Sequence, residues 1–133
     1  MSENLDLVRS IYADWERGDF SSADWAHPDI EVAVFEGPTP GGGTGVAAMA
    51  KAMADYARPW EGYRVEVDEY RALDDERVLV LVRQHGHGKA SGMDLTTMDT
   101  EAANVLRIQD GKVTRIVVYW ERSRAFADLG LTE

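Results

Sequence analysis

The sequence contains no cysteine, which excludes disulfide bonds and thiolate metal sites. It has no apolar run of about 18 residues and no basic, apolar segment at its start, so we expect neither a membrane span nor a signal peptide. Basic residues are also few, and the net charge of -10 would repel a phosphate backbone or an anionic membrane. We therefore expect a cytoplasmic protein that binds neither nucleic acid nor membranes.

The 133 residues fit one domain with one core, so residues 1–133 are expected to form a single unit. Apolar residues at three- and four-residue spacing from Asn4 to Arg17 predict an amphipathic first helix. The other expected elements are a short helix from Ser21 or Ser22 through Trp25, a strand over 30–35, a glycine-rich loop over 37–45, a helix over 46–57, strands over 63–73 and 77–87, a hairpin over 100–121 and a helix over 123–129. This order predicts an α+β fold in which a curved antiparallel sheet wraps around the N-terminal helices.

The hairpin turns at Asp110-Gly111, because Asp-Gly between two alternating runs is a strong hairpin signal. A two-residue loop would pair Leu106 with Arg115. A three-residue loop would pair Leu106 with Thr114 instead, and we prefer it because it makes one face apolar around a single amide. That inward face consists of Asn104, Leu106, Ile108, Ile116, Val118 and Trp120.

The opposite face of the hairpin mixes valines with charged residues, as a dimer contact does. The valines are Val105, Val113 and Val117. We therefore expect a homodimer that uses the outward face of the last strands.

Glu36 is the sharpest catalytic candidate. Alternation along the first strand puts it at the end of an apolar row formed by Ile30, Val32 and Val34. A carboxylate in such a place at a pocket can have its pKa raised toward the working range of a general base. The alternative interpretation is a solvated glutamate before a Gly-Pro turn.

The sequence His85-Gly86-His87 puts two imidazoles on one face of an extended segment, as a metal pair or a general base would require. No acidic residue follows at a close ligand spacing, so no metal is expected. We favour two polar residues at an exposed strand end.

The segment Gly43 to Ala48 follows a predicted strand, opens a predicted helix and resembles the glycine-rich fingerprint of dinucleotide-binding proteins. The segment Gly37-Pro38-Thr39-Pro40 separates the strand from these glycines, whereas a Rossmann turn must be tight. No cofactor is therefore expected.

Several segments together resemble the SnoaL-like proteins of the nuclear transport factor 2 superfamily, over essentially the whole chain. They are GD after the first helix, HPDIEV, DDERVLVLVRQHGHGKASG, LRIQDGKVTRI and RAFADLGL. The resemblance implies a cone in which a curved sheet wraps the helices around a pocket, and frequent homodimers. The superfamily includes ketosteroid isomerases, polyketide cyclases, dehydratases, epoxide hydrolases and non-catalytic transport factors, so the fold alone does not settle the function.

The resemblance also implies roles for single residues. Glu36 falls where a ketosteroid isomerase has its aspartate general base, and Asn104 where it has a buried acid that donates to the oxyanion, as an amide also can. Ile11 occupies the position of the oxyanion tyrosine, and Tyr12 is the next residue, which counts against steroid isomerisation. A relative, scytalone dehydratase, uses pocket histidines, which keeps His85 as a candidate. Plain core packing is the alternative for Tyr12 and Asn104.

The expected ligand site is an apolar pocket within the core. Its expected lining consists of Trp15, Met49, Met53, Trp60, Val118 and Trp120. The predicted function is binding of a small hydrophobic molecule, with a cofactor-free isomerase, cyclase or hydrolase as its enzymatic form: Glu36 would move the proton, and Asn104, with Tyr12 or His85, would stabilise an oxyanion. The alternative is a non-catalytic ligand-binding or dimeric interaction module of the same fold.

Overall fold

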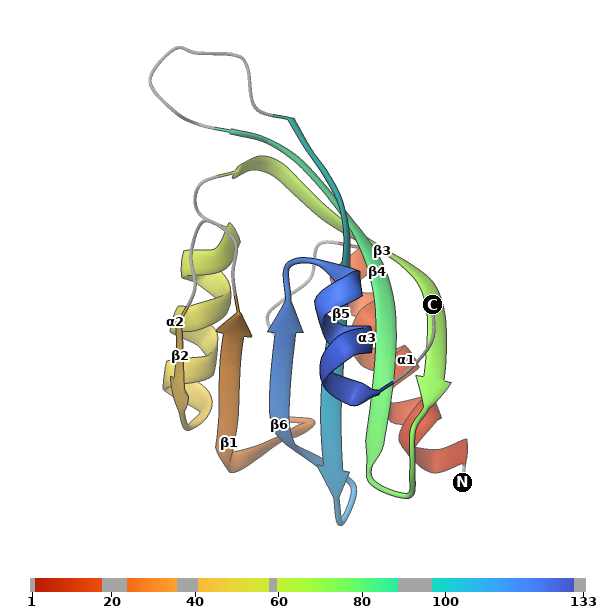
Figure 1. Ribbon diagram of the computed structural model, residues 1–133. Helices are drawn as coiled ribbons and strands as arrows, with labels where there is room; N and C mark the ends of the chain where they lie inside the picture. The colour runs from red at the N-terminus through yellow and green to blue at the C-terminus, as the bar shows by residue number, and fades with distance from the viewer. Residues whose placement is uncertain (1, 18–23, 36–40, 58–59, 89–96, 131–133) are drawn as a thin grey trace.

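The computed structural model describes residues 2–17, 24–35, 41–57, 60–88 and 97–130 (Figure 1). Along the chain the elements are α1 (Ser2–Glu16), β1 (Ala26–Phe35), β2 (Gly41–Thr44), α2 (Val46–Ala57), β3 (Trp60–Ala72), β4 (Arg77–Gly88), β5 (Thr97–Gln109), β6 (Lys112–Tyr119) and α3 (Arg122–Leu129). Within these ranges, none of the helices has both the length and the apolar character that a membrane crossing requires.

The strands form one sheet in the order β2-β1-β6-β5-β4-β3. Neighbouring strands are antiparallel except β1 and β6, which run parallel, so the sheet is mixed. α1 lies behind the sheet in Figure 1 and α3 in front of it, while α2 lies beside β1 and β2. We call the face toward α1 the inner face and the face toward α3 the outer face. The predicted α+β fold and its antiparallel meander are confirmed. The parallel pairing of β1 with β6 was not predicted from the sequence.

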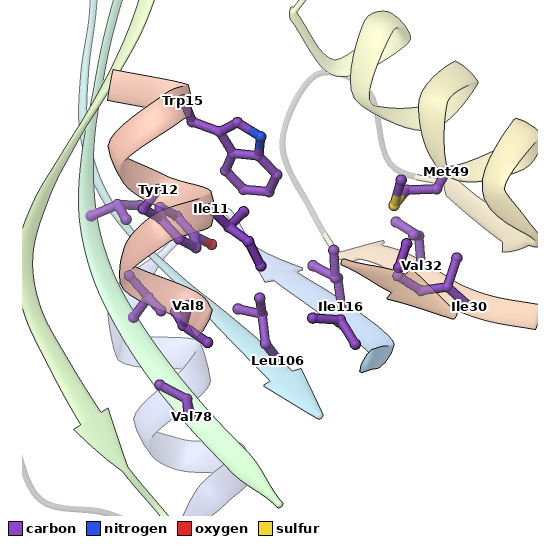
Figure 2. Close-up of a cluster of buried hydrophobic side chains, with 14 of the residues drawn as sticks. Val8, Ile11, Tyr12, Trp15, Ile30, Val32, Met49, Val78, Leu106 and Ile116 are labelled. Atoms are coloured by element: carbon purple, nitrogen blue, oxygen red, sulfur yellow. The ribbon is translucent and has the colours of Figure 1, made fainter. Parts of the chain in front are cut away.

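Buried apolar residues cover both faces of the sheet. The inner face and α1 share the main core, whose side chains Figure 2 shows between the helix and the strands. On the outer face, Ala125 and Phe126 of α3 pack against a second cluster that includes Leu79 and Val105. β4 therefore carries the continuous apolar run 78–82, as a strand covered on both faces does.

The helix predictions agree closely with the structure at two places. α2 has the predicted bounds, and α3 ends where Gly130 adopts a left-handed conformation, with φ of 69°, and donates its N–H to the carbonyl of Ala127. For the short second helix, Ser21 and Ser22 lie outside the described residues, and its expected end at Trp25 is a turn just before β1. A helix through Trp25 was therefore wrong.

Part of the glycine-rich segment that we expected to be a loop forms β2, which pairs with β1. Gly42 lies against Val32 there with φ of 152°, and a Cβ on it would sit 2.0 Å from the carbonyl oxygen of Val32. The glycines allow a close backbone approach that any side chain would prevent.

The preferred hairpin register was wrong. Asp110 and Gly111 both have positive φ, 53° and 76°, as a two-residue type I′ turn requires, and Gln109 pairs with Lys112. A bulge then shifts the pairing, and Thr114 is the extra residue.

The bulge explains why the predicted inner face is nevertheless correct. Beyond it Leu106 pairs with Ile116 and Asn104 with Val118, so even-numbered residues of both strands share one face. Val113, on the turn side of the bulge, points into the core and is fully buried rather than outward. The expected dimer patch therefore loses one of its three valines.

Candidate functional site

The main feature of the inner core is a hydrogen-bonded pair of polar side chains from α1 and β5. The Nδ2 of Asn104 donates to the hydroxyl oxygen of Tyr12 over 2.6 Å. Tyr12 reaches this position because it lies on the stripe of α1 that also carries Val8, Ile11 and Trp15, and Figure 2 shows this stripe facing the core.

Asn104 reaches the same place from the middle of β5. It pairs with Val80 on one side and Val118 on the other, and alternation along β5 turns its amide toward α1. Only 8% of Asn104 and none of Tyr12 is exposed. An amide and a phenol thus meet inside a core that is otherwise apolar around them.

One polar atom of this pair is unsatisfied. The Oδ1 of Asn104 is buried and has no hydrogen-bond partner within the described part of the chain. Turning the amide by 180° would let Oδ1 accept from Tyr12 and would leave Nδ2 unpaired instead, so either orientation leaves one amide atom without a partner. A buried unpaired group of this kind costs about 1–3 kcal/mol of stability.

Burial also determines the protonation state of Tyr12. Loss of hydration raises the pKa of its phenol well above the usual value, the hydrogen bond from Asn104 acts against this rise, and Tyr70 adds to it. The hydroxyl therefore keeps its proton at neutral pH and can donate it to a hydrogen bond. The rings of Trp15 and Tyr70 stand edge to face around that of Tyr12, with centroids 4.7 Å and 6.3 Å away.

Sequence reasoning missed Gln84, which is the second buried polar residue on the inner face. It follows Val78, Val80 and Val82 on the same face of β4, and only 2% of it is exposed. A partial signal was available, because alternation along this strand ends one of its two apolar rows on this amide, although it does not say which row is inward.

His85 does not join the pair formed by Tyr12 and Asn104. It belongs to the outer face of β4, and its Nε2 lies 3.5 Å from a carboxylate oxygen of Glu66. The side chain of its neighbour His87 lies outside the described residues. The described residues include no group of three His, Cys, Asp or Glu side chains arranged to hold a metal ion.

Glu36 lies outside the described residues, but the row that should lead to it is as predicted, with Ile30, Val32 and Val34 buried. Of the expected lining residues, Trp15 and Met49 are buried in the main core. Val118 and Trp120 are partly buried against the same core. The side chains of Met53 and Trp60 are not among those that the structure describes.

A comparison with curated proteins gave no match. Among solved structures, TerC co-crystallised with polyporic acid is similar over 96% of this chain and 98% of its own, with a TM-score of 0.73 and 23% identity. A protein of unknown function with a cystatin-like fold from Xanthomonas campestris is similar over 97% and 98%, with a TM-score of 0.74 and 17% identity.

A third similar structure is a hypothetical protein with a ketosteroid isomerase-like fold from Catenulispora acidiphila DSM 44928, in complex with trimethylamine. The similarity covers 96% of this chain and 94% of the other, with a TM-score of 0.69 and 18% identity. The family model of the SnoaL-like domain matches residues 8–116, which is most of the chain. The chain therefore belongs to the SnoaL-like domain family.

Proposed function

We propose that the protein binds a small, mostly apolar molecule between α1 and the inner face of the sheet, with Tyr12 and Asn104 as its polar contacts. The unpaired amide atom of Asn104 beside a protonated phenol carries this proposal. A ligand with a hydrogen-bonding group at that point would satisfy the amide atom of Asn104 that has no partner among the described residues.

The complexes of similar proteins support a small molecule as the ligand. TerC was crystallised with polyporic acid and the Catenulispora acidiphila protein with trimethylamine. The polar groups of this chain favour a ligand that carries both an oxygen acceptor and a hydroxyl donor. In the amide orientation of the structure, the O–H of Tyr12 would donate a hydrogen bond to the ligand's acceptor oxygen. The Oδ1 of Asn104 would accept a hydrogen bond from the ligand's hydroxyl.

The enzymatic form of the proposal is a cofactor-free isomerase, cyclase or hydrolase. Glu36 would take a proton from the carbon next to a ligand carbonyl, or would activate a water molecule. The electron pair left on carbon would move to the carbonyl oxygen, where the O–H of Tyr12 donates to the developing charge. The hydrogen bond from Asn104 polarises that O–H and makes it a better donor. The proposal leaves His85 out of this step, because alternation along β4 puts it on the outer face.

Native mass spectrometry of the purified protein tests the binding proposal. We expect a bound small molecule in the wild type and its loss from the Tyr12→Phe and Asn104→Leu variants. Asn4→Leu is a matched control, because Asn4 also belongs to α1 but its amide donates to the carbonyl oxygen of Asp75. The proposal is wrong if the two core variants retain the ligand as the control does.

The role of Glu36 separates the enzyme from the non-catalytic binding or interaction module. Titration of its carboxyl carbon by NMR, assigned with a Glu36→Gln variant, should give a midpoint above about 5.5 for a base in an apolar pocket. A midpoint near the ordinary value of about 4.3 would instead favour the non-catalytic module.

A homodimer and a cytoplasmic location complete the proposal. The outward valines now number two, Val105 and Val117, and α3 packs in the cluster that contains both, so any dimer through this face has a smaller apolar contact than the sequence predicted. Sedimentation velocity at micromolar concentration tests it, and a monomer there would exclude it. Cell fractionation with an antibody to the chain tests the location.

A further inference from the structure

The inner face of the sheet carries two buried amides, Asn104 of β5 and Gln84 of β4, whose exposed fractions are 8% and 2%. Asn104 pairs with Val80, so Gln84 lies four residues further along β4 than the partner of Asn104. With a rise of about 3.3 Å per residue and about 4.8 Å between neighbouring strands, the Cα atoms of the two amides are about 14 Å apart. The two amides therefore belong to separate places on the same face.

The surface between the two amides is apolar. Ala102 pairs with Val82 there, and both are buried in the main core. The side chain of Ala102 is smaller than that of Leu106, which lies on the same face of β5. The sheet thus offers an apolar surface with an amide at each end.

The helix α1 ends between the two amides. Glu16, its last residue, accepts a hydrogen bond of 3.1 Å from the backbone N–H of Val67. Val67 pairs with Val82, whereas Val65, two residues away on β3, pairs with Gln84. Asn104 therefore lies under α1, beside Tyr12, and Gln84 lies beyond the end of the helix.

Both amides can serve a ligand by the same chemistry. A primary amide has two N–H donors and one carbonyl acceptor. Gln84 has an interaction partner of its own, and the number of its donors and lone pairs allows a ligand contact in addition. A molecule that reached from Asn104 to Gln84 would therefore find a hydrogen-bonding group at each end and apolar side chains between them.

We propose that the ligand of the interior site is an elongated, mostly apolar molecule with a hydrogen-bonding group at each end, and that Gln84 selects for the second group. The inference rests on the proposed function, because Tyr12 and Asn104 hold the first group. Hydrogen bonds of about 2.8 Å at both ends leave roughly 8–11 Å between the two polar atoms of the ligand. Two aromatic rings in line with a hydroxyl at each end have this length.

The probes are para,para′-biphenol, which has a hydroxyl at each end, and para-phenylphenol, which lacks one of them. Isothermal titration calorimetry should show that the wild type binds the biphenol about three- to tenfold more tightly, as one additional hydrogen bond predicts. In Gln84→Leu the two probes should bind equally, or para-phenylphenol more tightly. Gln84→Met, which is unbranched like glutamine, should give the same result and guards against a packing defect of the leucine variant.

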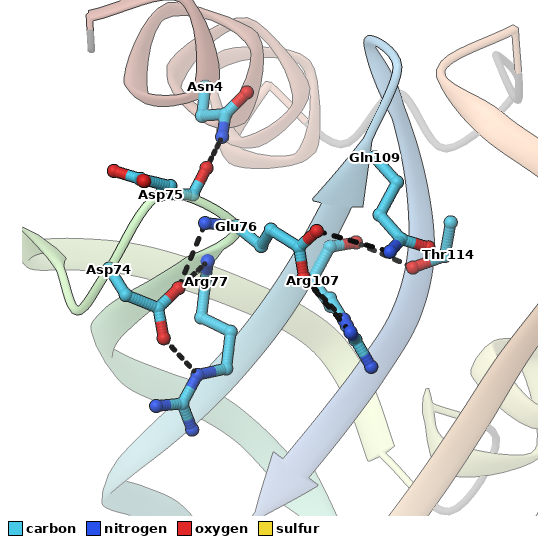
Figure 3. Close-up of polar contacts among 8 residues, drawn as sticks. All are labelled: Asn4, Asp74, Asp75, Glu76, Arg77, Arg107, Gln109 and Thr114. Carbon is cyan, nitrogen blue, oxygen red and sulfur yellow. Dashed lines mark hydrogen bonds and ion pairs between the residues drawn. The ribbon is translucent and has the colours of Figure 1, made fainter.

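Gln109→Leu is the matched control. Gln109 is an exposed glutamine at the other end of β5, and its amide donates to Glu76 within the polar contacts of Figure 3. This variant should retain the wild-type preference for the biphenol. Tyr12→Phe should weaken both probes by a similar factor, because it changes the end of the site that both of them use.

The outcomes separate this inference from the proposed function. If the missing hydroxyl costs the same affinity in Gln84→Leu as in the wild type, the role of Gln84 is wrong. If the wild type binds both probes equally and Tyr12→Phe weakens both, the interior site remains and only the second polar end is overturned. If neither probe binds, or if Tyr12→Phe binds both as the wild type does, the inference and the proposed site fail together.

Discussion

Replacing Tyr12 by phenylalanine should destabilise the protein even though the ring stays in place. The variant removes the hydroxyl that accepts the 2.6 Å hydrogen bond from Asn104, and the surroundings cannot supply a replacement because Tyr12 is fully buried. Asn104 then has both amide atoms unpaired, since its Oδ1 already lacks a partner among the described residues. Leaving a buried donor without a partner predicts a loss of about 1–3 kcal/mol.

The double variant should behave differently from the sum of the two single ones. Asn104→Leu alone leaves the Tyr12 hydroxyl unpaired, which again predicts a loss of about 1–3 kcal/mol, partly offset by the added apolar side chain. Tyr12→Phe with Asn104→Leu removes every polar atom of the pair, including the one that is unsatisfied in the wild type. Replacing both partners by apolar groups of similar shape is nearly neutral or stabilising.

Urea denaturation of the four proteins, followed by tryptophan fluorescence, measures this cycle. We expect a coupling energy of at least about 2 kcal/mol and a double variant at least as stable as the wild type. The reasoning would be refuted by a double variant whose loss equals the sum of the two single losses. If the double variant is stable but has lost the small molecule, the pair is retained for binding rather than for folding.

Two further predictions concern the outer face and the edge of the sheet. Although burial acts to raise the pKa of Asp68, hydrogen bonds from Arg83 and Arg122 outweigh it and lower the pKa, so the stability from this carboxylate should be present above about pH 4 and lost as the pH falls further. Urea denaturation at several pH values should therefore show a steeper acid loss in the wild type than in Asp68→Asn, and equal slopes would contradict the ion-pair argument. Gly42→Ala should cost at least about 2 kcal/mol, because its Cβ would overlap the β1 backbone, whereas Gly111→Ala, with nothing within 4 Å, should cost about 1–2 kcal/mol from its positive φ alone. Thermal unfolding of both variants compares them, and equal losses would mean that β2 moves away from β1 at little cost.

Much of the fold followed from local rules that the sequence contains. The spacing of Val8, Ile11, Tyr12 and Trp15 determined which side of α1 is buried, and Gly130 determined where α3 ends. These features depend on residues within a turn or two of each other, so propensity and periodicity are sufficient to predict them.

The candidate site was predictable residue by residue but not as a unit. Alternation put Asn104 on the inner face and helical spacing put Tyr12 toward the core, yet their contact joins residues 92 positions apart and depends on how α1 lies across the sheet. The same alternation puts Gln84 at the end of one apolar row of β4. His85 was assigned no face by the sequence, because alternation gives two faces without saying which one is inside.

Only the tertiary structure decided the register and the pairings that cross the chain. The Asp-Gly turn alone does not choose between a register with the bulge at Thr114 and a register without it. The register with the bulge puts Val113 in the core and keeps Asn104 beside Val118. The parallel contact between β1 and β6 also depends on partners distant in sequence. A sequence determines which residues prefer burial, but which neighbours they have depends on the packing of all the elements at once.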